Sequence, residues 1–97
     1  MIDYYNREGK EIDLDTWEKF LSDTNYKIIK QENVGKYWVS TVWLGLNHQY
    51  GEGEPLIFET MVFKGKESDL DCERYTTEEE AIKGHQKMVK KYLSLTK

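Results

Sequence analysis

Two long segments rich in β-branched and aromatic residues place the strongest constraint on the fold of this chain. They run from Tyr37 to Leu46 and from Leu56 to Lys64, and a polar, glycine-containing segment from Asn47 to Glu54 separates them. β-branched and aromatic side chains favour strands, whereas Gly and Asn favour turns. The pattern therefore predicts two long strands that form an antiparallel hairpin with a wide loop.

Weaker strand patterns lie on both sides of this hairpin. Residues Ile2 to Tyr5 predict a short strand that turns at 6–9 and returns at 10–12, and further strands are expected at Tyr26 to Gln31 and at Asp71 to Tyr75. We therefore expect a central antiparallel sheet of about four to five strands.

Two helices are expected to pack on this sheet. Asp13 is a suitable N-cap for a short helix that ends near Ser22. Thr77 and Glu80 form a capping-box pattern that begins a longer C-terminal helix. The apolar stripe of this second helix consists of Ala81, His85, Met88 and Tyr92. The chain is thus predicted to be a single α+β domain spanning residues 1–97.

Composition excludes several classes of function and location. The net charge of −4 makes general nucleic-acid binding unlikely, because phosphate binding depends on Lys and Arg. The single cysteine, Cys72, cannot form an internal disulfide, which fits a reducing compartment. We find neither a signal-peptide pattern nor an apolar run near the roughly 20 residues that cross a bilayer. These observations predict a cytoplasmic protein with no membrane partner.

Three titratable residues are candidates for catalysis. Glu59 interrupts the apolar alternation of its strand, His48 opens the glycine loop, and His85 lies on the inner stripe of the last helix. A carboxylate and two imidazoles can act as acids, bases or ligands, so the set is compatible with a small hydrolase, metal-dependent or acid–base. The alternatives are that Glu59 is paired with a neighbouring Lys, Arg or Trp N–H or lies at the sheet margin, and that His85 is a hydrogen-bonded core residue.

Alternating carboxylates near the predicted last strand are a weak candidate metal site. Asp69, Asp71 and Glu73 would point to one side of an extended segment and could hold Ca²⁺ or Mg²⁺. The commoner explanation is a solvated acidic edge that discourages strand pairing. We expect no cofactor.

The number of aromatic residues points to a binding surface. The chain has three tryptophans and seven tyrosines, and Trp38 and Trp43 occupy different faces of one predicted strand. Surplus rings near a loop are typical of surfaces that bind proteins or stack on bases. The candidate binding residues are Trp38, Trp43, His48, Tyr50, Glu59 and Arg74.

Long segments of the sequence resemble a known group of proteins. These are VSTVWLGLNHQYGEGEPLIFETMVF from Val39 to Phe63 and CERYTTEEEAIKGHQKMV from Cys72 to Val89. The chain resembles a family of small uncharacterised proteins of bacteriophages and prophages over nearly its whole length. It has Asn47 and Tyr50 where the family would have Asp and Phe, so a role that needs a carboxylate at position 47 is not expected. The resemblance implies a phage-encoded accessory protein in the cytoplasm of a bacterial host.

Three hypotheses for function follow. The favoured one is a non-catalytic binder that inhibits a host protein or defence system, as anti-CRISPR proteins do, or that sequesters a signal nucleotide. The second is a structural or assembly component that forms homo-oligomers through an exposed strand edge. The third is the hydrolase centred on His48, Glu59 and His85.

Overall fold

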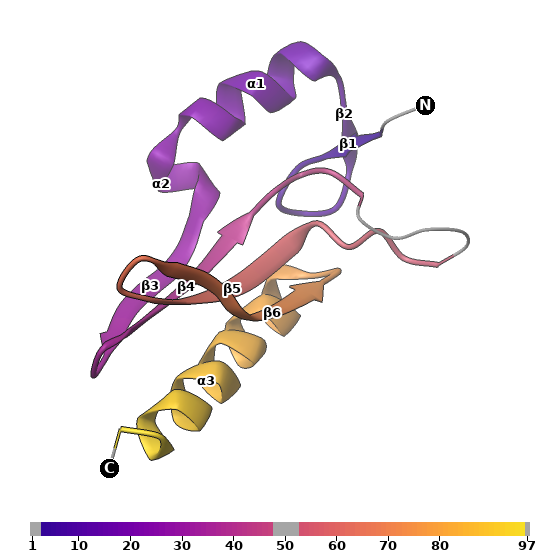
Figure 1. Ribbon diagram of the computed structural model, residues 1–97. Helices are drawn as coiled ribbons and strands as arrows, with labels where there is room; N and C mark the ends of the chain where they lie inside the picture. The colour runs from indigo at the N-terminus through magenta and orange to yellow at the C-terminus, as the bar shows by residue number, and fades with distance from the viewer. Residues whose placement is uncertain (1–2, 48–52, 97) are drawn as a thin grey trace.

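The computed structural model describes residues 3–47 and 53–96 and has an α+β fold (Figure 1). Its main sheet has four antiparallel strands in chain order, so each strand pairs with its sequence neighbour. The strands are β3 (Ile28–Val34), β4 (Tyr37–Trp43), β5 (Phe58–Lys64) and β6 (Glu67–Tyr75). A separate two-stranded ribbon consists of β1 (Tyr4–Tyr5) and β2 (Glu11–Ile12). The predicted fold class and the capped helices are confirmed.

One long helix covers one face of the main sheet (Figure 1). This helix, α3 (Glu78–Ser94), contacts all four strands. Thr77 and Glu80 form the capping box that fixes its first turn. The short helices α1 (Leu14–Ser22) and α2 (Thr24–Lys27) lie with the ribbon at one end of the sheet, where α2 contacts β3 and β4.

Strand alternation divides the side chains between two faces. Thr41 and Trp43 point toward α3, whereas Trp38, Ser40 and Val42 point to the opposite side. We call this opposite side the open face, because among the described residues no helix lies along it. The cross-strand register continues this division into β5, where Glu59, Met61 and Phe63 belong to the open face.

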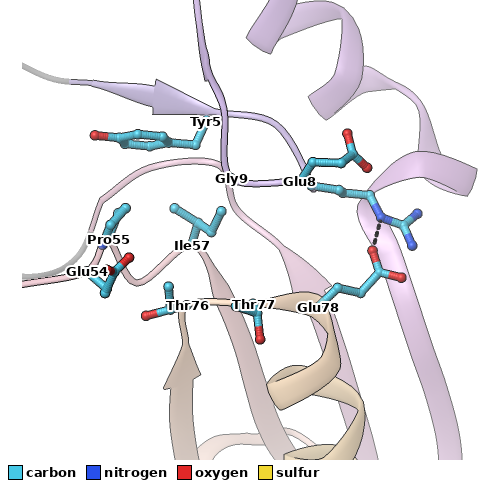
Figure 2. Close-up of a pocket in the computed structure, with 10 residues that line it drawn as sticks. Tyr5, Glu8, Gly9, Glu54, Pro55, Ile57, Thr76, Thr77 and Glu78 are labelled. Carbon is cyan, nitrogen blue, oxygen red and sulfur yellow. Dashed lines mark hydrogen bonds and ion pairs between the residues drawn. The ribbon is translucent and has the colours of Figure 1, made fainter.

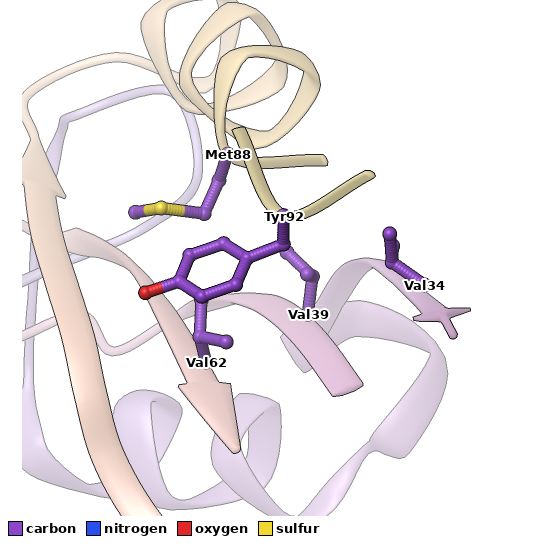
Figure 3. Packing of buried hydrophobic residues seen from close by; sticks show 5 residues of the cluster. All are labelled: Val34, Val39, Val62, Met88 and Tyr92. Carbon is purple, nitrogen blue, oxygen red and sulfur yellow. The ribbon is translucent and has the colours of Figure 1, made fainter. Parts of the chain in front are cut away.

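The core between the sheet and α3 consists of two apolar clusters. One contains Val34, Val39, Val62, Met88 and Tyr92 (Figure 3). The other is built around fully buried Trp43, Ile57, Phe58 and Ala81, and it extends to the rings of α1 and α2 at the end of the sheet. A row of polar side chains separates the two clusters, and it is described with the site below.

Several element boundaries differ from the sequence prediction. Tyr26 does not begin a strand, because Asp23 caps the one-turn helix α2 and β3 starts only at Ile28. The strand β4 ends at Trp43 rather than at Leu46, since Gly45 adopts a positive φ of 71°. The last strand is longer than predicted and already begins at Glu67.

No helix within the described residues is both long enough and apolar enough to cross a membrane.

Candidate functional site

His85 is fully buried and both of its ring nitrogens are hydrogen-bonded. Its Nε2 lies 2.7 Å from Oε1 of Glu32 on β3, and its Nδ1 lies 2.7 Å from Oγ1 of Thr41 on β4. The Thr41 hydroxyl lies 2.5 Å from that of Thr60 on β5. The helix side chain is therefore the link between the outer strand β3 and the two inner strands.

The hydrogen-bonded chain continues to the opposite edge of the sheet. The hydroxyl of Tyr75 on β6 donates to Oγ1 of Thr60 at 3.1 Å and has a second acceptor, Oε2 of Glu73, at 3.4 Å. Burial raises the pKa of Tyr75 to about 12, so the phenol is a neutral donor at neutral pH. We call the chain of Glu32, His85, Thr41, Thr60 and Tyr75 the polar row.

Part of the polar row has the order of an acid, a histidine and a hydroxyl, as in a nucleophilic triad. Here the hydroxyl belongs to Thr41, which is 0% exposed and is already bonded to Thr60. A substrate carbonyl cannot reach a hydroxyl in this position. The structure therefore places His85 as a hydrogen-bonded core residue, and the Thr41 hydroxyl is not exposed as a nucleophile would have to be.

Glu59 is buried on the open face and paired with a cation. Its side chain accepts a hydrogen bond from Nε of Arg74 at 3.0 Å, and Sγ of Cys72 donates to the same oxygen at 3.5 Å. The paired alternative for Glu59 is thus confirmed. Its neighbour Thr60 points toward α3, so the sheet lies between Glu59 and His85. The two residues cannot act together on one substrate.

Asp71 of β6 is paired with side chains of α3. Asp71 accepts hydrogen bonds from Nζ of Lys91 at 2.5 Å and from the hydroxyl of Tyr92 at 3.1 Å. The bond from Lys91 holds the pKa of Asp71 below its usual range. Asp71 therefore faces α3, so the prediction of a solvated acidic edge is wrong for this residue, whereas Glu73 is exposed. Within residues 3–47 and 53–96 no three metal-ligating side chains are grouped, and the side chain of Asp69 lies outside the described set.

The open face carries an apolar stripe on its two central strands. Trp38 and Val42 from β4 and Met61 and Phe63 from β5 form this stripe, and all four side chains are half-buried. A hollow of about 400 Å³ lies on this face, and Leu21, Thr24 and Lys27 of α1 and α2 form its wall at one end. The hollow is bounded at one end by these helices, and its lining combines apolar side chains with Gln31, Ser40 and Glu59.

Three of the six predicted binding residues lie together on this face. Trp38, Glu59 and Arg74 belong to it. The prediction that Trp43 belongs to a binding surface is wrong, because Trp43 is 0% exposed and its indole N–H donates to the carbonyl of Tyr5. His48 and Tyr50 lie outside the described residues.

The prediction missed the apolar members of the stripe. Met61 and Phe63 alternate with Glu59 along one strand, so a period of two already placed them on the same face. This alternation does not show which face of the sheet α3 covers. The sequence therefore indicates that Met61 and Phe63 share a face with Glu59, but only the tertiary structure shows that this face is the open one.

A second hollow of about 630 Å³ lies between the ribbon, the residues before β5 and the start of α3 (Figure 2). Arg7 is the cation among its described lining residues, and its Nε donates to Oε1 of Glu78 at 2.7 Å. This bond lowers the pKa of Glu78. Because Glu8 and Glu54 also line the hollow, its charge does not favour a phosphate group.

Comparison with known proteins identifies no relative: no family model, no curated protein and no solved structure matches this chain.

Proposed function

We propose that this protein is a non-catalytic binder that docks a partner protein on the open face of its sheet. The observation that carries the proposal is the asymmetry of the sheet: α3 covers one face, whereas the apolar stripe on the other has no helix over it within the described residues. An apolar sheet face is normally buried against another layer. A partner protein would supply that layer.

The residue types of the open face support this role. Its apolar stripe occupies the two central strands of the four, and Ser40 and Glu59 lie among these apolar side chains. Trp38 and Arg74 add residue types that are enriched among the energetically dominant residues of interfaces.

The family resemblance supplies the biological setting of the proposal. A small acidic accessory protein of a phage, acting in the bacterial cytoplasm, would use this surface to inhibit a host protein or a defence system. The burial of His85 and its separation from Glu59 remove the support that these two residues gave to a hydrolase. Binding is the function that the described side chains support best.

The proposal is tested by recovering the tagged protein from a bacterial lysate in three forms. Phe63→Asp places a carboxylate in the stripe, and Ile82→Asp is the matched control on α3, where Ile82 is 40% exposed. A buried unpaired carboxylate costs more than about 1.4 kcal/mol, which is a tenfold loss of affinity. We expect at least tenfold lower recovery of a partner with Phe63→Asp alone, measured by quantitative mass spectrometry.

Thermal unfolding followed by circular dichroism shows whether each variant is folded before the recoveries are compared. Equal recovery of every co-purifying protein by the wild type and by a folded Phe63→Asp variant contradicts the proposal.

A further inference from the structure

We infer that the partner protein inserts a tyrosine side chain into the hollow of the open face, where the phenol donates to Glu59 and accepts from Ser40. The inference rests on the proposed function and names the side chain that anchors the partner. Its evidence is two buried polar groups with unfilled hydrogen-bonding positions, the apolar side chains around them and the charges that line the hollow.

Ser40 and Glu59 are both buried in the lining of this hollow. Each of them is only 8% exposed. Buried polar groups in proteins almost always have hydrogen-bond partners, because a buried group without one costs free energy. A few polar groups that converge within an apolar lining are typical of binding pockets. The two residues therefore mark the part of the open face that can select an occupant.

Each of the two side chains has one hydrogen-bonding position that the described residues leave unfilled. Ser40 accepts from Nε2 of Gln31 through its Oγ, and no described residue accepts from the Ser40 O–H. Glu59 uses Oε2 for both Arg74 and Cys72, and no described residue donates to its Oε1. The hollow thus presents one free donor and one free acceptor.

One hydroxyl group can use both positions. The register places Ser40 opposite Met61 and Val42 opposite Glu59, so Ser40 and Glu59 are diagonal neighbours on one face. Diagonal neighbours lie about 7–8 Å apart, within the reach of long side chains. A hydroxyl that donates to one oxygen and accepts from another joins two atoms up to about 5.5 Å apart. A phenol between the two side chains would therefore bond to both.

The rest of the hollow suits an aromatic ring. Leu21, Val42, Met61 and Phe63 are among its apolar lining residues. Its volume of about 400 Å³ is near the lower end of the range of about 300–1,000 Å³ for ligand pockets, so it fits one large side chain rather than a long segment. Tyrosine joins an apolar ring to a polar tip and is enriched among the dominant residues of interfaces.

The charges around the hollow favour a neutral occupant over a charged one. Half-buried Lys27 lies in the wall and Arg74 is bonded to Glu59, so the guanidinium of an arginine would meet two cations. A carboxylate would meet Glu59 in the same hollow. Among the neutral rings, phenylalanine fills neither hydrogen-bonding position, and the indole of tryptophan only donates. Tyrosine fills both.

Capped amino acids test the hollow without the partner. N-acetyl-tyrosinamide and N-acetyl-phenylalaninamide differ by one hydroxyl group, and NMR chemical-shift titration of the isotope-labelled full chain measures the affinity of each. We expect the tyrosine compound to shift amides of β4 and β5 around the hollow. It should bind at least about tenfold more tightly, because phenylalanine leaves both buried groups without a partner.

Two variants and a matched control assign this preference to the proposed groups. Ser40→Ala and Glu59→Gln should each lower the preference for the tyrosine compound by about threefold or more. Ser94→Ala removes a hydroxyl from α3 and should leave the preference unchanged. The same spectra show whether each variant is folded. Equal affinities of the two compounds for the wild type, or no shifts around the hollow, overturn the inference.

The partner that is recovered by the wild type and lost with Phe63→Asp provides the second test. Each of its tyrosines is replaced by phenylalanine. One replacement should weaken binding to the wild type at least about tenfold, and it should weaken binding to Ser40→Ala by a smaller factor, because that variant already lacks the shared bond.

The outcomes separate this inference from the proposed function. A partner that tolerates every tyrosine replacement overturns the tyrosine anchor and leaves the binding function intact. Recovery that Phe63→Asp does not change contradicts the binding function itself, whereas the titration with capped amino acids does not depend on that recovery.

Discussion

The polar row has a direction that mutation can reveal. With one proton on the ring, His85 donates from Nε2 to Glu32, so its Nδ1 is an acceptor and Thr41 donates to it. Thr60 then donates to Thr41, and Tyr75 donates to Thr60. Tyr75 is therefore the first donor of the chain, and Thr41 is an internal member.

This direction predicts that removing different hydroxyls of the polar row lowers the free energy of unfolding by different amounts. Thr41→Val leaves two buried groups unsatisfied, Nδ1 of His85 and the hydroxyl of Thr60, at about 1–3 kcal/mol each. Tyr75→Phe removes only a leading donor and should cost about 0.5–1.5 kcal/mol. We expect Thr41→Val to lower the free energy of unfolding by about 2–6 kcal/mol, which is more than the loss expected for Tyr75→Phe.

Urea unfolding at pH 7 and 25 °C measures both free energies, and Thr60→Val should fall between the two. The double variant Thr41→Val with Thr60→Val should cost less than the sum of the single changes, because the two residues share one bond. A larger loss for Tyr75→Phe than for Thr41→Val would refute the direction of the chain.

Two further predictions concern backbone strain and pH. Gly45→Ala should lower the free energy of unfolding by about 2–4 kcal/mol and Gly9→Ala by about 1–2 kcal/mol. Both glycines have a positive φ, but only at Gly45 would a Cβ overlap tryptophan rings. Equal losses in urea unfolding would count against this steric account. Asp71 has a lowered pKa in the folded state, so its pairing with Lys91 stabilises the protein above about pH 4 and is lost as the pH falls through the lowered pKa. Asp71→Asn should therefore reduce the fall in melting temperature between pH 7 and pH 3, and an unchanged fall would show that another carboxylate dominates.

Local sequence signals predicted the parts of the fold that local physics decides. The capping box of Thr77 and Glu80 and the N-cap Asp13 each satisfy backbone N–H groups within a few residues, and both helices begin where those signals place them. Tyr26 was assigned to a strand because aromatic residues favour strands. In the structure Asp23 caps its backbone N–H, and its ring stacks on Phe20, so local capping and packing outweighed propensity.

The candidate site could be predicted only in part. Alternation placed Glu59 with Met61 and Phe63, but burial of one sheet face depends on where α3 packs, which is a contact between distant segments. The same limit explains the wrong prediction for Trp43, because tryptophan is a common residue type in binding surfaces but this side chain lies in the core. The partners of His85 come from β3 and β4, so no spacing in the sequence could have named them.

The open face is most directly tested by native mass spectrometry of the untagged protein isolated gently from a bacterial lysate, as wild type and as Phe63→Asp. The account predicts a discrete complex of one 11.6 kDa chain with a different protein, present for the wild type and absent for the folded variant. A bare chain or a homodimer for both proteins would contradict the claim that the open face binds a partner protein.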